Sequence, residues 1–294
     1  MSMSVRPRRS VLYMPGANTR ALEKARTLPA DALIFDLEDA VAPDAKEAAR
    51  ANVVAAAQSK AYGKREIAIR CNALATPWGA ADITAIARSG ADAVVVPKVE
   101  SAAEVASVVA LLDAAGAPPS MAVWAMMETP KGILRAEEVA GSHPRLTLFI
   151  MGTNDLVKDM RARHTPMRLP MITALGLGML AARAHGLTIL DGVYNDIQDA
   201  EGFRAVCQQG LEMGFDGKTL IHPSQVEPCN EVFAPSAAEL EMAGKIVTAF
   251  KAARSSSFIK LSGPNPWGRQ MPSTRDPSSC TARHEAVIFA GLWA

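Results

Sequence analysis

The sequence predicts an α/β protein that folds as a (β/α)8 TIM barrel, because short apolar runs alternate with longer alanine-rich segments that carry charges at helical spacing. There are about eight such units, the number that a TIM barrel needs. The runs are almost continuously apolar, which is typical of parallel strands buried on both faces. A doubly wound open sheet is the alternative, because the number of strands alone does not show that the sheet closes.

The expected strands follow one another at regular intervals along the chain. In order, their sequences are SVLYMP, ALIFDL, EIAIRCN, AVVVPK, AVWAMME, LTLFIMG, LTILDGV and GKTLIHP. Helices are expected between them, for example over residues 42–61 and 101–116. The second helix starts with Ser101, and Glu104 three residues later completes a capping-box pattern.

Length and composition allow one barrel-sized domain or two smaller ones in a soluble globular protein. The chain has 294 residues, of which 49% are hydrophobic and 21% are charged, and its formal net charge is +1. This balance, without a basic stripe, gives no indication of nucleic-acid binding. No apolar stretch is long enough to span a membrane, and the N-terminal MSMSVRPRRS lacks the apolar core of a secretory signal.

The cysteines also point to a cytoplasmic protein. Cys71, Cys207, Cys229 and Cys280 are scattered and form no CxxC pair. The spacing argues against a zinc ribbon or a disulfide framework and fits a reducing compartment.

One motif suggests a different function. GLGMLA, residues 176–181, matches the G-x-G-x-x-A fingerprint of dinucleotide-binding proteins and would indicate an NAD-dependent oxidoreductase. The fingerprint requires a preceding strand and a tight turn into a helix. Here it lies inside the helical pattern of residues 171–186, so we expect the glycines to allow close packing of that helix against the barrel.

Ionisable or polar residues follow nearly every expected strand. Because the active site of a TIM barrel lies at the carboxyl ends of the strands, these side chains should meet on one rim. In chain order they are Arg20, Lys24, Asp36, Glu38, Asp39, Arg70, Asn72, Lys98, Glu128, Asp155, Asp191 and His222. Each has a structural explanation when taken alone, such as a helix cap or a salt bridge, but the whole set indicates a functional site.

The chemistry of this set suits a hard divalent cation. Glu128 and Asp155 follow neighbouring strands, and two carboxylates with waters and substrate oxygens make a typical open Mg²⁺ site. Mn²⁺ accepts the same ligands. No cluster of histidines and cysteines competes for zinc or iron, and His222 before a proline favours a structural role. The planar guanidinium of Arg70 suits a carboxylate or a polarised carbonyl.

Taken together, the motifs resemble the citrate lyase beta subunit-like group of the HpcH/HpaI aldolase superfamily. They are RSVLYMPGANTRALEKA, DALIFDLEDAVAPDAKEAAR, IRCN, VVPKVE, MMETPKG, MGTNDL, LDGVYNDIQDAEGF and GFDGKTLIHPSQV. MMETPKG, GTNDL and DGVYN look most like the malyl-CoA thioesterase and malyl-CoA lyase branch. The resemblance implies a (β/α)8 barrel that handles CoA thioesters with Mg²⁺ and assembles as a homo-oligomer, a trimer or a hexamer.

The resemblance also implies roles for residues at matching positions. Glu128 and Asp155 match the metal ligands, and Arg70 matches the arginine that grips substrate oxygens. Glu38 and Asp39 match the acidic pair that borders the metal, so catalytic roles are expected for these two residues and for Arg70. Binding of the substrate or of CoA is expected for Arg20, Lys24, Arg70 and Lys98.

The expected reaction is the Mg²⁺-dependent cleavage of a C–C bond in a 3-hydroxyacyl-CoA such as malyl-CoA, which gives an acyl-CoA and a 2-oxo acid. The alternative is a (3S)-malyl-CoA thioesterase, which hydrolyses the thioester to malate and CoA. Both reactions use one binding site, so the sequence separates them poorly. A non-catalytic CoA-binding subunit and an NAD-dependent oxidoreductase are less favoured.

The chain is predicted to consist of a catalytic TIM-barrel domain, residues 1–253, and a divergent C-terminal tail, residues 254–294. The tail is rich in Ser, Pro and Arg and shows no sustained periodicity, so we expect it to be poorly ordered. In the family that the sequence resembles, a lid segment occupies this part of the chain. Without that lid, lyase turnover should suffer more than substrate binding, because water weakens electrostatic interactions in an open site.

Overall fold

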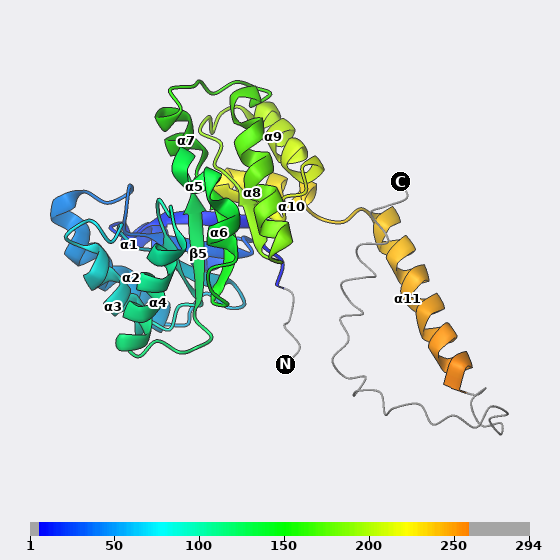
Figure 1. The fold of residues 1–294 in the computed structure, drawn as a ribbon, viewed down its shortest axis with the longest axis horizontal. Coiled ribbons are helices and arrows are strands. Elements are labelled where there is room, and N and C mark those ends of the chain that lie inside the picture. Colours follow the sequence, from blue (N-terminus) through cyan, green and yellow to red (C-terminus); the bar gives the residue numbers. More distant parts are fainter. Residues whose placement is uncertain (1–5, 259–294) are drawn as a thin grey trace. The chain divides into compact units, whose positions relative to one another are not determined.

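A computed structural model describes residues 6–258 and shows a closed barrel of eight parallel strands (Figure 1). The strands pair in chain order, and β8 pairs with β1 to close the ring. They are β1 (Ser10–Pro15), β2 (Ala32–Asp36), β3 (Glu66–Arg70), β4 (Ala93–Val96), β5 (Ala122–Met127), β6 (Leu146–Met151), β7 (Thr188–Asp191) and β8 (Gly217–Leu220). The predicted TIM barrel is therefore confirmed, and the open sheet is wrong.

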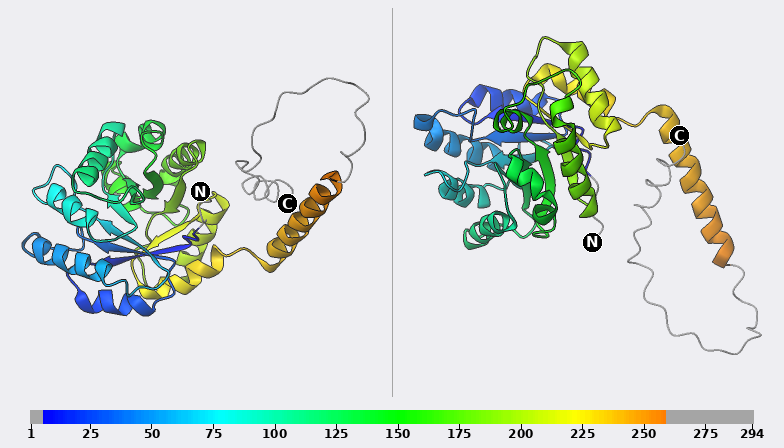
Figure 2. Two further views of the ribbon diagram at one scale, coloured as in Figure 1. Left: turned by 90° about the horizontal axis from the view of Figure 1, so that it is seen from below. Right: turned by 45° about the horizontal axis from the view of Figure 1, so that its top comes forward.

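Helices surround the strands, as Figure 2 shows. Short 3₁₀ helices lie in four of the segments that join strands and α-helices. They are η1 (Ala25–Thr27), η2 (Pro43–Ala45), η3 (Leu169–Met171) and η4 (Pro223–Gln225). The α-helices of the barrel are α1 (Thr19–Lys24), α2 (Lys46–Gln58), α3 (Gly79–Ala87), α4 (Ala102–Ala114), α5 (Pro130–Leu134), α6 (Ala136–Ala140), α7 (Thr153–Asp159), α8 (Ile172–Ala184), α9 (Ala200–Glu212) and α10 (Val226–Val232).

The apolar core has two layers, because successive side chains of a strand point to opposite faces. A smaller layer fills the inside of the barrel and includes Ile34 and Met126, and a larger layer lies between strands and helices. Asp36 and Glu128 each lie two residues beyond one of these inner residues, so they share its inward side. This alternation brings charged groups to the inner rim at the carboxyl ends of the strands.

The capping box predicted at α4 forms only in part. Ser101 Oγ accepts a hydrogen bond from the Glu104 backbone N–H at 3.3 Å, as expected for the cap. The Glu104 carboxylate accepts instead from the backbone N–H of Glu100, at 2.7 Å. The second bond of the box therefore falls one residue before the cap.

The GLGMLA stretch lies inside α8, without the strand and tight turn that the dinucleotide fingerprint requires. A Cβ at Gly178 would come within 2.8 Å of Met151 Sδ, so this glycine permits the expected close packing on β6. Gly176 has nothing within 4 Å of such a Cβ. The packing explanation thus holds for one glycine of the motif and not for the other.

Two compact units make up the chain, residues 1–233 and 234–294. The first unit is the barrel, and the second contains α11 (Ala237–Phe258). The domain boundary predicted at residues 253 and 254 remains a prediction, and α11 continues across it. The rest of the predicted tail, residues 259–294, lies outside the described residues. No helix in the described part of the chain has the length and apolarity needed to cross a membrane.

The seam between β8 and β1 should be sensitive to a single added carbon. A Cβ at Gly217 would overlap the backbone of Arg8 and Arg9, with Arg9 Cα at 2.7 Å. We expect Gly217→Ala to lower the free energy of unfolding by about 1 to 3 kcal/mol, because backbone atoms cannot move aside cheaply. Gly176→Ala is the control and should raise it by about 0.5 to 1 kcal/mol, because alanine fits the open helix position. Urea unfolding would measure both, and equal effects would contradict the explanation.

Candidate active site

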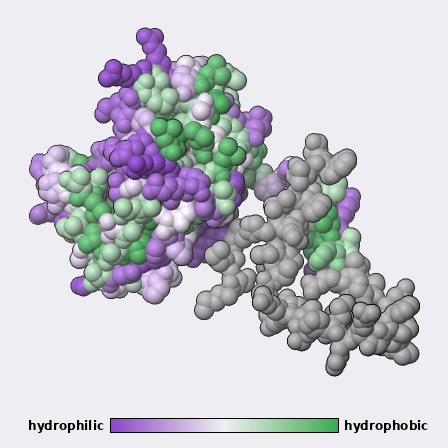
Figure 3. Space-filling model, in the orientation of Figure 1, coloured by the Kyte–Doolittle hydropathy of each residue, from purple (hydrophilic) through white to green (hydrophobic). Residues whose placement is uncertain are grey.

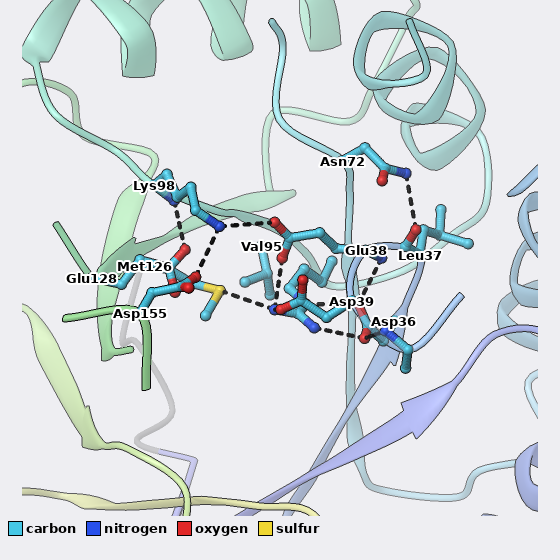
Figure 4. Close-up of polar contacts among 12 residues, drawn as sticks. Asp36, Leu37, Glu38, Asp39, Asn72, Val95, Lys98, Met126, Glu128 and Asp155 are labelled. Carbon is cyan, nitrogen blue, oxygen red and sulfur yellow. Dashed lines mark hydrogen bonds and ion pairs between the residues drawn. The ribbon is translucent and has the colours of Figure 1, made fainter. Parts of the chain in front are cut away.

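Charged side chains from five consecutive strand ends meet at the carboxyl end of the barrel (Figure 4). Asp36 and Arg70 are the last residues of β2 and β3, and they are paired in the β2–β3 register. Lys98 follows β4, and Glu128 follows β5 directly. Asp155 lies in the first turn of α7, just after β6. The structure thus brings together the charged residues at the ends of β2 to β6, five of the eight expected strands.

Arg70 is held by carboxylates on three sides. Its Nε and Nη2 donate to the two carboxylate oxygens of Asp36, both at 2.6 Å. Its Nη1 lies 2.7 Å from Glu38 Oε2 and 3.3 Å from Asp39 Oδ2. Although burial disfavours the charge, the Asp36 carboxylate raises the pKa of Arg70 above its ordinary value. The guanidinium is thus a fixed positive charge, and only Nη1 can be freed for a substrate oxygen, by displacing exposed Asp39.

Glu38 connects Arg70 to Lys98. Its Oε2 makes the ion pair with Arg70, and its Oε1 lies 3.6 Å from Lys98 Nζ. Burial raises the pKa of the Glu38 carboxyl above its ordinary value, although the charges of Arg70 and Lys98 oppose this. Glu38 is therefore better suited than an ordinary carboxylate to accept a proton near neutral pH.

The backbone of Lys98 binds the side chain of Glu128, and its ammonium binds Asp155. The Lys98 backbone N–H donates to Glu128 Oε1 at 2.8 Å, and Lys98 Nζ lies 2.8 Å from Asp155 Oδ2. Glu128 is only 2% exposed, and burial, with the Glu38 charge second, raises the pKa of its carboxyl to about 7. Gly152 makes room for this side chain, because a Cβ there would overlap it, with Glu128 Cδ at 3.0 Å.

These carboxylates fit a hard cation. Figure 4 shows Glu128 and Asp155 close together, with the Lys98 side chain between them and Glu38. A buried carboxyl with a raised pKa, such as Glu128, gains from a neighbouring cation that stabilises its charged form. No group of three or more His, Cys, Asp or Glu residues within residues 6–258 is arranged to hold a metal ion. A site with two protein carboxylates, completed by waters and substrate, is the kind that Mg²⁺ accepts.

Two of the predicted binding residues lie outside this cluster. Arg20 and Lys24 are exposed on α1, the helix that follows β1. Within residues 6–258, neither side chain makes a hydrogen bond or ion pair, although Thr27 Oγ1 donates to the backbone carbonyl of Lys24 at 3.0 Å. Their side chains are therefore available to a ligand at the rim.

Asp191, the last residue of β7, and His222, which follows β8, do not join the cluster. Asp191 accepts from Arg168 Nη1 at 2.7 Å and pairs with Lys218 Nζ at 3.0 Å. Because its neighbour Leu190 belongs to the inner layer, Asp191 points outward toward the helices. His222 caps η4, where its Nδ1 lies 2.7 Å from Ser224 Oγ. The structural interpretation of His222 agrees with this geometry.

Two residues of the site received no role from the sequence. One is Asp36 of the DLED run, in which the resemblance implies roles for Glu38 and Asp39 only. Its inward direction has no signal in the sequence, because apolar residues occupy both faces of a strand that is buried on both sides. The other is Tyr13 of β1, because Arg70 Cζ lies over its ring, 5.0 Å from the ring centroid.

The sequence is similar to those of several known proteins. The profile of the family described as HpcH/HpaI aldolase/citrate lyase matches residues 9–223. The chain is 54% identical over 253 residues to a (3S)-malyl-CoA thioesterase from Cereibacter sphaeroides, covering 86% of each chain. It is 37% identical to the citrate lyase subunit beta of Escherichia coli, covering 84% of each chain.

Solved structures show the same fold. One is the protein CitE from Mycobacterium tuberculosis in complex with magnesium, acetoacetate and coenzyme A. It is 27% identical to this chain, covers 98% of both chains and superimposes with a TM-score of 0.70.

Two neighbouring acids allow a test of the Arg70 interactions. The Asp36 side chain is 2% exposed and binds Arg70 through both oxygens, whereas the Asp39 side chain is 69% exposed and makes one longer contact. We expect Asp36→Asn to lower the free energy of unfolding by about 3 kcal/mol, because it leaves a buried guanidinium short of countercharge. Asp39→Asn, the control, should change it by less than about 0.5 kcal/mol. If urea unfolding gave similar losses of unfolding free energy for both variants, the bidentate pair would contribute no more to stability than the exposed contact of Asp39.

Proposed function

The chain belongs to the HpcH/HpaI aldolase/citrate lyase family, and on that premise we propose that it is a Mg²⁺-dependent enzyme that hydrolyses the thioester of malyl-CoA to malate and CoA. The observation that carries this proposal is the 54% identity to a (3S)-malyl-CoA thioesterase, against 37% to a citrate lyase subunit beta. It favours the thioesterase alternative over the C–C lyase that was the first expectation from the sequence.

The other two hypotheses have less support. The nicotinamide-binding hypothesis loses its basis, because GLGMLA lies within α8. A non-catalytic CoA-binding subunit would not need the arrangement of Arg70, Glu128 and Asp155 at the strand ends.

In the proposed enzyme, Glu128 and Asp155 would hold Mg²⁺. The bound ion would act as a Lewis acid that polarises a substrate oxygen and orients the malyl group. That the M. tuberculosis relative was crystallised with magnesium supports the choice of metal. Mn²⁺ would bind the same ligands.

The protein's own groups would orient the substrate and move the proton. Arg70, fixed by Asp36, would place a permanent positive charge beside a substrate oxygen at its Nη1. The carboxylate of the malyl group would replace Asp39 there, because that side chain is exposed and weakly held. Glu38 would accept the proton of the attacking water at its carboxylate, since burial raises its pKa toward the working range of a general base.

The CoA portion would lie along the rim near α1. Arg20 and Lys24 are exposed there, and cationic side chains attract the phosphates of CoA. Coenzyme A is present in the M. tuberculosis complex, which supports a CoA thioester as substrate.

We also propose that the chain forms a homo-oligomer. Hydrophobic residues gather over α5 and α8 in Figure 3, where Leu134 and Leu180 are 80% and 71% exposed. Exposed apolar patches of this kind often mark contacts between proteins. The patch supports self-association but leaves the expected trimer or hexamer as a prediction.

The reaction can be identified from its products. Purified protein should release free thiol together with malate when it is given malyl-CoA and Mg²⁺. Free thiol together with glyoxylate would instead indicate C–C cleavage followed by hydrolysis, and unchanged malyl-CoA would support a non-catalytic protein. A fluorescence titration with NADH should show no binding.

Removal of either metal ligand should abolish metal-dependent hydrolysis. We expect Glu128→Ala and Asp155→Ala each to lower kcat/KM by more than about 100-fold, because even changes behind a metal ligand cost about 10- to 100-fold. The control is Asp113→Asn, which removes a carboxylate that pairs with Arg145 at 2.7 Å near the end of α4, just before the start of β6. Near-normal turnover of either alanine variant, with circular dichroism showing an intact fold, would remove the basis of the assignment.

A further inference from the structure

Lys98 contacts both proposed metal ligands through two different groups. Its backbone N–H binds Glu128 Oε1, and its ammonium binds Asp155 Oδ2, each at 2.8 Å. Within residues 6–258, no hydrogen bond or ion pair reaches the second oxygen of either carboxylate. One oxygen of each ligand is thus held by Lys98, and the other is available.

The backbone of Lys98 supports a role that depends on placement. Its φ angle is 51°, in the left-handed region that is unfavourable for a residue with a Cβ. Glycine would adopt this conformation without strain, but it would provide no ammonium group. A strained residue that persists beside a cluster of carboxylates suggests that both its N–H direction and its side chain are needed.

The Lys98 ammonium also balances negative charge in the cluster. The cluster contains two cations, Arg70 and Lys98, and five carboxylates, those of Asp36, Glu38, Asp39, Glu128 and Asp155. Arg70 is committed to Asp36, so Lys98 is the cation that lies between Glu38 and Asp155. It therefore reduces the repulsion that would otherwise drive these acids apart.

We propose that Lys98 is a positioning residue of the metal site, which orients Glu128 through its N–H and Asp155 through its ammonium so that their free oxygens converge on the cation. This role differs from the substrate or CoA binding expected for Lys98 from the sequence. The inference rests on the proposed function, because it assumes that Glu128 and Asp155 hold a metal. Hydrogen-bonding partners behind metal ligands are known to set ligand orientation and affinity.

Metal affinity without substrate provides the test. Mn²⁺ binding to the full chain, followed by electron paramagnetic resonance, should be about 10- to 100-fold weaker in Lys98→Met than in the wild type. Lys98→Gly keeps the N–H and relieves the left-handed strain, so it should fold at least as well and show a similar loss. Lys131→Met is the matched control, because it removes an exposed lysine that also pairs with a carboxylate at 2.8 Å, and it should leave Mn²⁺ affinity unchanged.

Other results would overturn the inference in distinguishable ways. Tighter Mn²⁺ binding in Lys98→Met would show that the ammonium competes with the metal for Asp155. Unchanged Mn²⁺ affinity together with weaker binding of CoA would return Lys98 to the role of a substrate ligand. Both results would leave the proposed function standing. A wild-type chain that binds no Mn²⁺ would remove the proposed function, and the positioning role with it.

Discussion

The pair of short bonds between Asp36 and Arg70 determines how the rest of the site is arranged. Both residues end their strands and lie opposite each other in the β2–β3 register, so the barrel itself sets their distance. Asp36 also accepts from the backbone N–H groups of Glu38 and Ala40, at 2.8 and 3.0 Å, which shapes the turn that carries the acidic pair. One buried carboxylate therefore fixes both the guanidinium and the acids that surround it.

The site concentrates negative charge where the fold alone would not favour it. Glu128 is almost fully buried, and its carboxyl has a pKa of about 7. Since burial makes the ionised form unfavourable, the residue lowers the free energy of unfolding progressively as the pH rises from 4.5 to about 7, and fully above that, unless a cation compensates its charge. A protein that keeps such a group gains its benefit in binding and catalysis, as is common at active sites.

The sequence predicted the barrel and the set of strand ends, but it did not predict which side chains point inward. In strands buried on both faces, apolar residues occupy both sides, so the pattern does not show the inward positions. LTILDGV therefore gave no indication that Leu190 faces the interior and Asp191 the helices. The left-handed backbone of Lys98 follows a proline and has no local signature either. Lyase and thioesterase activities remained unseparated because both need the same metal ligands and arginine.

Gly152 restricts how this barrel could acquire other activities. It is the N-cap residue just before α7, and the Glu128 side chain occupies the space that any larger residue at this position would need. Any larger residue at Gly152 would displace the Glu128 side chain. This position must therefore stay glycine for as long as Glu128 is needed to hold the metal. Diversity in substrate choice within related barrels would then have to arise elsewhere on the rim, for instance at exposed positions such as Asp39.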